Sequence, residues 1–297
     1  MIPLLTLKAP AKINLGLTII RRRVDGYHDL ESVMQQVSLS DTLRFEAGQF
    51  RGWRFLCSNP ELAGEDNLVC RAAELMAGKT GKPLPGVMIT LFKNIPVEAG
   101  LAGGSSDAAA ALIGLNHCWQ LGYSMGDLLE LALLLGSDVP YCLQGGTVVA
   151  RGRGEQLEQL PPLPFFWVVL ALPEGVKVST ATAYSSFDQN LLGEPSLQLL
   201  INAIQAGSRK EITDWLGSGL TNTLETAVLP GSDQVAGLKS KLQAAGFQPV
   251  LSGSGPTLLI LTEDYSRARS AVRAAEEAGA RAYLCWTKPG GKEWLNV

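Results

Sequence analysis

The chain has 297 residues, of which 46% are hydrophobic and 18% are charged, and its formal net charge is −3. Because a single domain usually has about 100–200 residues, we expect two domains that share a cleft. The composition is that of ordinary soluble globular proteins, which excludes disordered chains and polyelectrolyte binders, so no nucleic-acid partner is expected.

The cysteines and the apolar runs indicate a protein of the reducing cytosol. The five cysteines are scattered and contain no C-x-x-C pair that would suggest zinc or dithiol chemistry. The most apolar run, residues 165–172, is far shorter than the ~18 residues of a membrane span and is interpreted as a buried strand. The start, MIPLLTLKAP, lacks the features of a signal peptide. We therefore expect a cytoplasmic location and no membrane partner.

The first half of the chain mixes strand and helix patterns. Strands are predicted over residues 4–8, 14–20 and 87–92, and helices over residues 105–119 and 127–135. This mixture predicts an α+β domain that ends at the L-P-P-L-P segment, residues 160–164.

The second half begins with the strand predicted over residues 165–172. It continues with helices over 196–205 and 234–245, paired strands near 248–251 and 256–262, a helix over 265–278 and a strand over 281–286. The sequence S-G-S-G joins the paired strands, since glycine accepts the positive φ of a tight turn. We place the domain boundary between residues 160 and 161.

The most informative stretch is IPVEAGLAGGSSDAAAALIGL, residues 95–115, in which a loop of small residues leads into an alanine-rich helix. The glycines Gly100, Gly103 and Gly104 let backbone amides approach an anion, and Ser105 and Ser106 add hydroxyls. The helix N-terminus adds free N–H donors and a positive dipole end. The stretch is interpreted as a phosphate cradle, although a tight turn with a serine N-cap would use the same residues.

Two other phosphate motifs are excluded. The segment Gly78-Lys79-Thr80 imitates the end of a Walker A loop, but the glycine required five positions earlier is Ala73. No G-x-G-x-x-G opens a helix after a strand, so a dinucleotide site has no support.

Polar residues stand out in three other segments, and each segment has a structural alternative. Lys12 and Asn14 share one face of an apolar strand and would meet a ligand in a cleft, or Lys12 would lie in solvent on an edge strand. Tyr27 and His28 follow in a polar cluster that would also simply close a turn. Asp138 lies between a helix end at Gly136 and Pro140, in what we expect to be a rigid turn from helix to strand.

Taken together, these stretches resemble the motifs of the GHMP kinases in their order along the chain. The matching segments are P-A-K-I-N-L-G-L, D-G-Y-H, A-G-L-A-G-G-S-S-D-A-A, G-S-D-V-P and L-S-G-S-G-P-T. The resemblance covers nearly the whole chain and is weak between residues 173 and 188. The D-G-Y-H-x-L segment looks specific to the members that act on a cytidine diphosphate derivative of methylerythritol, rather than on homoserine or mevalonate.

The resemblance implies a two-domain α+β fold, with an N-terminal nucleotide-binding domain and a ferredoxin-like C-terminal domain that flank the active site. It implies transfer of a phosphoryl group from ATP, with Mg²⁺, to the 2-hydroxyl group of that small-molecule acceptor in the non-mevalonate route to isoprenoids. Metal ligands and oligomeric state are not predicted.

The resemblance also implies roles for individual residues. Asp138 would take the proton of the attacking hydroxyl, Lys12 would keep that aspartate ionised and offset charge, and Asn14 would orient the acceptor. Tyr27 and Tyr184 would sandwich the cytosine and His28 would bond to its edge. His117 is expected in the core. The residues expected to hold the triphosphate are Pro96, Val97, Glu98, Ala99, Gly100, Leu101, Ala102, Gly103, Gly104, Ser105 and Ser106.

One departure from the family pattern is Ala102, where the motif usually has glycine; the extra methyl should be tolerated if φ is negative. Three alternatives remain open. They are a GHMP kinase with another alcohol acceptor, a catalytically silent nucleotide-binding regulator, and a scaffold protein without a ligand. Retention of both Lys12 and Asp138 argues against the regulator, and the glycine-rich loop argues against the scaffold.

Overall fold

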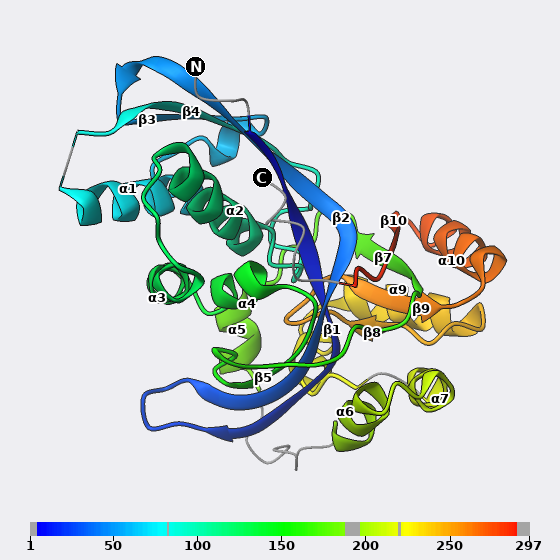
Figure 1. Ribbon diagram of the computed structural model, residues 1–297. Helices are drawn as coiled ribbons and strands as arrows, with labels where there is room; N and C mark the ends of the chain where they lie inside the picture. Colours follow the sequence, from blue (N-terminus) through cyan, green and yellow to red (C-terminus); the bar gives the residue numbers. More distant parts are fainter. Residues whose placement is uncertain (1–4, 82, 188–196, 219–220, 290–297) are drawn as a thin grey trace.

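The computed structural model describes residues 5–81, 83–187, 197–218 and 221–289. A long antiparallel ribbon of two strands, β1 (Leu5–Arg22) and β2 (His28–Arg51), runs through the molecule (Figure 1). The two strands predicted over residues 4–8 and 14–20 are therefore one continuous strand. Three irregularities in its pairing with β2, after Pro10, Asn14 and Ile19, interrupt the alternation that sequence periodicity relies on.

The first half of the chain builds a six-stranded sheet with helices packed against it. The strand order is β3-β4-β2-β5-β6, with β1 paired to β2, and only β3 and β4 are parallel. The further strands are β3 (Trp53–Cys57), β4 (Pro85–Phe92), β5 (Thr147–Gly152) and β6 (Gln156–Gln159). A 3₁₀ helix, Pro60–Leu62, follows β3, and the helices are α1 (Leu68–Thr80), α2 (Gly103–Cys118), α3 (Met125–Leu135) and α4 (Val139–Gln144).

Local sequence explains where these helices begin and how closely they pack. Asn67 caps α1 by accepting from the amide of Val69, and Ser124 and Asp127 form a capping box at the start of α3. Helix α2 is fully buried over most of its length, and its alanines permit close packing against α1 and the β1–β2 ribbon. A Cβ on Gly114 would lie only 2.2 Å from the ring of Phe45, so glycine is required for that approach.

The second half builds the four-stranded sheet β10-β7-β9-β8. Its strands are β7 (Trp167–Pro173), β8 (Val250–Leu251), β9 (Leu258–Thr262) and β10 (Ala280–Trp286). Its helices are α5 (Thr180–Ser185), α6 (Gln198–Gln205), α7 (Arg209–Ser218), α8 (Glu225–Val228), α9 (Asp233–Ala244) and α10 (Tyr265–Glu277). Antiparallel pairing and a β-α-β-β-α-β order give the ferredoxin-like arrangement that the resemblance implied.

The two halves share a hydrophobic core. One buried cluster joins Ala11, Ile13 and Leu15 of β1 to Val168 and Leu170 of β7. Separate clusters fill the space between the first sheet and its helices, and between the second sheet and α9 and α10. The domain boundary after residue 160 remains a proposal, and the shared cluster couples the parts on either side of it.

Three expectations about individual positions are settled by the fold. Gly78, Lys79 and Thr80 form the last turn of α1, as expected of a false Walker motif. His117 is exposed rather than in the core, because it lies on the outer face of the last turn of α2. Asp138 lies between two helices, α3 and α4, rather than between a helix and a strand.

None of the helices in the described part of the chain combines the length and the apolarity that a membrane crossing needs.

Candidate active site

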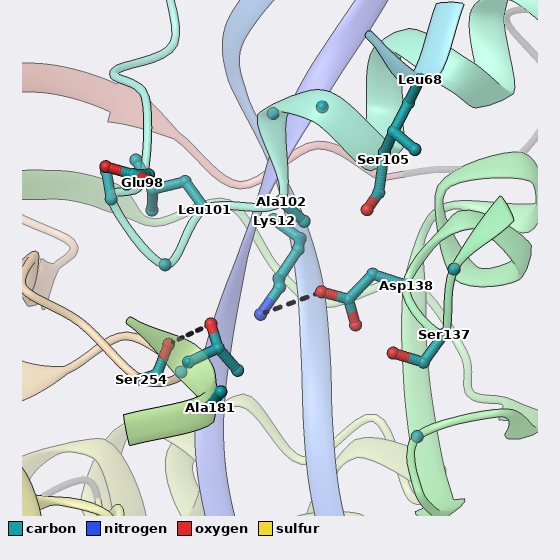
Figure 2. Close-up of a pocket in the computed structure, with 18 of the residues that line it drawn as sticks. Lys12, Leu68, Glu98, Leu101, Ala102, Ser105, Ser137, Asp138, Ala181 and Ser254 are labelled. Atoms are coloured by element: carbon teal, nitrogen blue, oxygen red, sulfur yellow. Dashed lines mark hydrogen bonds and ion pairs between the residues drawn. The ribbon is translucent and has the colours of Figure 1, made fainter. Parts of the chain in front are cut away.

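A cavity of about 1130 Å³ lies where the glycine-rich loop, the β1–β2 ribbon and the second half of the chain meet. It is large enough for two small ligands side by side, since a typical ligand pocket has about 300–1,000 Å³. Figure 2 shows Lys12 reaching into it from β1 and Asp138 facing Lys12 from the loop before α4. Among the residues predicted for the site, those that line the cavity are Lys12, Asn14, Tyr27, His28, Pro96, Val97, Glu98, Ala99, Gly100, Leu101, Ala102, Gly103, Gly104, Ser105, Asp138 and Tyr184.

The glycine-rich loop is held against the turn that joins β8 and β9. A Cβ on Gly100 would lie 2.4 Å from the carbonyl oxygen of Ser252, and its φ is +74°, so this position requires glycine on two counts. The same turn carries Gly253, on which a Cβ would lie 3.3 Å from Nζ of Lys12. The L-S-G-S-G-P-T motif therefore contributes to the site by allowing the backbone to come close to the loop and to the lysine.

Ala102 has a φ of +52°, in the left-handed region, so the condition under which the extra methyl was expected to be tolerated, a negative φ, is not met. Ala102 is the N-cap residue of α2, and its own side chain makes no capping hydrogen bond. Glu98, earlier in the same loop, is also left-handed, with a φ of +54°. A non-glycine residue in this region carries a conformational cost of about 1–2 kcal/mol, which the surrounding packing must offset.

Gly103 and Gly104 face different surroundings although they are adjacent. A Cβ on Gly103 would lie 3.1 Å from Cγ2 of Ile95 and 3.2 Å from Nζ of Lys93, both beneath the loop. A Cβ on Gly104 would meet only Leu68 of α1, at 3.7 Å. A side chain at Gly104 would therefore enter free space at the N-terminal end of α2.

The two serines at the start of α2 also differ. Ser105 lines the cavity, and Figure 2 shows its side chain directed toward the space beside Asp138. Ser106 is fully buried and is not among the lining residues, so its hydroxyl lies behind the loop in this structure. The helix N-terminus with its free amides and Ser105 together form a surface suited to an anion.

An irregularity in β1 places Lys12. The pairing with β2 shifts between Pro10 and Lys12, and the amide of Lys12 instead donates to the carbonyl of Leu101 at 3.1 Å. This bond ties the lysine directly to the glycine-rich loop. Nζ of Lys12 donates to Oδ1 of Asn14 at 2.7 Å and lies 4.0 Å from Oδ2 of Asp138.

The side chains of Lys12 and Asp138 differ in their exposed fraction, and this difference suits different roles in a reaction. The Lys12 side chain is 7% exposed and that of Asp138 is 33% exposed, so the lysine is fixed in the wall while the carboxylate faces the open space. The backbone places Asp138 as the N-cap residue of α4, with Pro140 at the start of that helix. Its carboxylate makes no capping hydrogen bond and is therefore available to a ligand.

At the other end of the cavity, the turn between β1 and β2 carries Tyr27. Gly26 has a φ of +85°, and the amide of Tyr27 donates to Asp25, whose carboxylate also pairs with Arg23 at 3.0 Å. Tyr27 is 57% exposed, and the guanidinium carbon of Arg153 lies over its ring, 4.8 Å from the ring centroid. The turn thus presents a flat aromatic face to the cavity.

His28 follows this turn and is 7% exposed. Its ring packs on Tyr184 at a centroid distance of 5.6 Å and meets the edge of Phe187 at 6.3 Å. Burial, with a smaller contribution from Arg22, lowers the pKa of His28, so its imidazole is neutral at pH 7. A neutral imidazole has one donor and one acceptor nitrogen and can select a complementary polar edge.

Sequence reasoning missed a buried charged cluster directly beneath the glycine-rich loop. Nζ of Lys93 donates to Asp41 at 2.5 Å and to Asp107 at 2.8 Å, and Asp41 also accepts from the amide of Ile95. Burial and the nearby Asp41 raise the pKa of Asp107 to about 8, against the attraction of Lys93. A single carboxylate in an alanine-rich helix, and a lysine at the end of an apolar strand, were the signals that could have revealed it.

The comparisons with known proteins agree with this architecture. Residues 67–146 match the GHMP kinases N terminal domain, and residues 200–281 match the GHMP kinases C terminal domain. The chain is similar to the 4-diphosphocytidyl-2-C-methyl-D-erythritol kinase of Gloeothece citriformis, with 43% identity over 89% of this chain and 88% of the relative. The enzyme of the same name from Listeria monocytogenes is 41% identical over 99% of both chains.

Solved structures give the same picture. A crystal structure of 4-(cytidine 5'-diphospho)-2C-methyl-D-erythritol kinase superposes with a TM-score of 0.80 and 34% identity, covering 97% of this chain and 100% of the other. A homoserine kinase from Cytophaga hutchinsonii superposes with a TM-score of 0.71 and 18% identity, covering 97% and 95%, so that likeness concerns the fold alone.

Proposed function

The chain belongs to the GHMP kinase family, and we propose that it transfers the γ-phosphoryl group of ATP to the 2-hydroxyl group of 4-diphosphocytidyl-2-C-methyl-D-erythritol. The observation that carries this proposal is the position of Lys12 and Asp138. They lie 4.0 Å apart in one cavity that also contains the glycine-rich loop and the aromatic residues Tyr27, His28 and Tyr184. Phosphoryl transfer depends mainly on positioning and charge stabilisation, which this arrangement supplies.

ATP is the phosphate donor of this family, and we propose that residues 96–105 hold its phosphates. Gly104 leaves space at the start of α2, and the free amides of that helix point to the same region. Ser106 has its hydroxyl behind the loop, so we assign the hydroxyl contact to Ser105.

We propose that Mg²⁺ accompanies ATP. Mg²⁺ usually takes one or two protein oxygens and completes its shell with phosphates and water. The residues present fit this requirement, because Ser105 lines the cavity and Oδ1 of Asp107, also in its wall, has no hydrogen-bond partner among the described residues. Ser105 and the deprotonated form of Asp107 would hold the ion, which would neutralise charge on the phosphates.

The reaction itself would use Asp138 and Lys12. The carboxylate of Asp138 would accept the proton of the attacking hydroxyl, since it is exposed to the cavity and has no capping bond. The ammonium of Lys12, fixed by Asn14 and by the bond from its amide to Leu101, would offset the negative charge that develops on the transferred group. Asn14 would orient the hydroxyl-bearing end of the acceptor.

The aromatic end of the cavity would bind the cytosine. Tyr27 and Tyr184 would contact its faces, and the neutral imidazole of His28 would bond to its polar edge. Stacking alone does not separate cytosine from uracil, because both present an aromatic face. The edge does separate them, since cytosine offers an amine donor and a ring-nitrogen acceptor where uracil offers the reverse.

A competition assay tests the proposal. The purified protein, ATP and Mg²⁺ are supplied with the cytidine acceptor, its uridine analogue and nucleotide-free methylerythritol phosphate. We expect kcat/KM at least about tenfold lower for the uridine analogue, because each mismatched group in a dry site costs about 1–3 kcal/mol. His28→Ala should narrow this gap, whereas Tyr27→Ala should weaken both nucleotides alike.

The other outcomes have distinct meanings. Indifference to the base, or preference for the nucleotide-free acceptor, would overturn the cytidine assignment and leave a GHMP kinase with another alcohol acceptor. Full turnover after removal of divalent metal would contradict the role of Mg²⁺.

A further inference from the structure

A chain of three hydrogen bonds lies behind Lys12. Nζ of Lys12 donates to Oδ1 of Asn14 at 2.7 Å, and Nδ2 of Asn14 donates to Oγ of Ser32 at 2.7 Å. The hydroxyl of Ser32 then donates to the carbonyl oxygen of Gly16 at 2.6 Å. Lys12, Asn14 and Ser32 are all buried, Ser32 completely, so bulk water does not substitute for these contacts.

The direction of this chain is fixed by its two ends. A lysine ammonium can only donate, and a backbone carbonyl can only accept. The Ser32 hydroxyl uses its single hydrogen on Gly16, so toward Asn14 it can only accept, and Asn14 must present its NH₂ group there. The amide oxygen of Asn14 is thereby left facing Lys12.

The backbone creates this arrangement at an irregularity in the ribbon. The pairing of β1 with β2 shifts between Asn14 and Gly16, so that Gly16 lies opposite Val33 and Leu17 lies opposite Ser32. Such a shift interrupts the regular hydrogen bonding between the two strands and changes the direction in which neighbouring side chains point. Ser32 completes the irregularity by bonding to the carbonyl of Gly16.

We propose that Ser32 is a positioning residue for phosphoryl transfer: it orients the amide of Asn14 so that the amide oxygen holds the ammonium of Lys12 beside Asp138. Ser32 is not among the residues that line the cavity, so it would act without touching either substrate. This inference rests on the proposed function and adds a residue from β2 that determines how well the lysine is held.

The first test replaces Ser32 by alanine. Without the hydroxyl, the Asn14 amide can turn its NH₂ group toward the ammonium, which repels it. We expect kcat to fall roughly 5- to 30-fold, because a misdirected buried hydrogen bond is lost. KM for ATP should change less than about twofold, since no contact to the nucleotide is removed. Ser32→Cys, which keeps the volume but bonds weakly, should act in the same direction, and Ser32→Thr should retain turnover.

Thr147→Val is the matched control for stability. Thr147 on β5 is also fully buried, and its hydroxyl donates to Gln35 and accepts from the amide of Leu163. Its loss should lower the melting temperature about as much as Ser32→Ala and leave kcat unchanged. An equal loss of kcat in both variants would make Ser32 merely structural.

A double-mutant cycle tests the orientation itself. A carboxylate offers two equivalent acceptor oxygens, so in Asn14→Asp the direction of the group no longer matters. In that background, adding Ser32→Ala should change kcat less than about twofold. An equal effect of Ser32→Ala with and without Asn14→Asp, or an unchanged kcat in Ser32→Ala and Ser32→Cys, would overturn the proposal while leaving the proposed function in place. A wild-type protein without kinase activity would overturn the function, and the role of Ser32 with it.

Discussion

At the scale of single residues, the site combines one carboxylate open to the cavity with one lysine fixed in its wall. Asp138 is 33% exposed, and Nζ of Lys12 lies 4.0 Å from its carboxylate. Lys12 is held by Asn14 and by the bond from its own amide to the glycine-rich loop. The two residues therefore suit different tasks, proton transfer and charge stabilisation.

Asp138→Asn tests the first of these tasks. The amide keeps the size of the side chain but cannot take a proton, so we expect kcat to fall by about 10²–10⁴-fold. Binding of ATP, measured by calorimetry, should remain nearly unchanged. Turnover close to that of the wild type would remove Asp138 from the mechanism.

Asp107 gives a prediction about pH. Burial and the nearby Asp41 raise the pKa of Asp107 to about 8, although Lys93 attracts its charged form. The folded protein then holds a proton that the unfolded chain has released, so this group makes folding less favourable as pH rises from about 4 to about 8. Relative to Asp107→Asn, the wild type should lose free energy of unfolding across this window.

Urea unfolding of both proteins at several pH values measures the difference. Titrating groups that make no contact with the Asp107, Asp41 and Lys93 cluster are common to the two proteins and cancel in the comparison. If the two stability curves ran parallel from about pH 5 to about pH 8, Asp107 would not be protonated in the folded state.

At the scale of elements, the glycine-rich loop carries strain at Ala102. Its left-handed backbone costs an alanine about 1–2 kcal/mol, and a glycine there would remove that cost while adding freedom to the unfolded chain. We expect Ala102→Gly to raise the free energy of unfolding by about 0.5–1 kcal/mol. Ala99 is a control in the same loop, since its φ is not positive; Ala99→Gly should destabilise the protein. A loss of stability in both variants would contradict the strain at Ala102.

The same loop predicts different outcomes at two adjacent glycines. Gly104→Val places a side chain at the open start of α2 and should weaken ATP binding much more than acceptor binding. Gly103→Val pushes against Ile95 and Lys93 and should instead lower the melting temperature. Calorimetry with each ligand and thermal unfolding separate the two effects. Equal loss of both ligands in Gly104→Val would indicate misfolding.

The sequence predicted those elements whose residue pattern depends only on neighbours along the chain. Helix α2 and the turn at Gly253 and Gly255 follow from small residues that the backbone geometry requires. The long strand β2 was missed because buried polar residues such as Ser32 and Asp41 interrupt its apolar pattern, and their partners lie on other elements. Those partners cannot be read from spacing along the chain.

The same limit applies to the site. Sequence motifs named Lys12 and Asp138, and the structure brings them into one cavity with Tyr27 and His28. The φ of Ala102 and the contact of Lys93 with two carboxylates depend on tertiary packing, so residue identity alone did not predict them.

At the scale of the whole molecule, the shared core predicts cooperative unfolding. Apolar residues of β1 and β7 lie in one buried cluster, so separating the halves would expose surface on both. Hydrogen exchange should therefore give similar opening free energies for α2 in the first half and for β9 in the second. Two well-separated values would show that the parts on either side of residue 160 unfold independently.

The continuous strand β2 has one further consequence, for the length of the acceptor. His28, which we propose binds the base, and Ser32, which we propose positions Lys12 through Asn14, lie on this one strand. Four residues of strand span roughly 13 Å, and a paired strand cannot stretch. We therefore expect the fixed distance from the base-binding residue to the reacting groups to select acceptors by their length. An acceptor with one phosphate fewer or one more between base and polyol would still bind by its cytosine, yet its hydroxyl would stop short of Asp138 or pass beyond it.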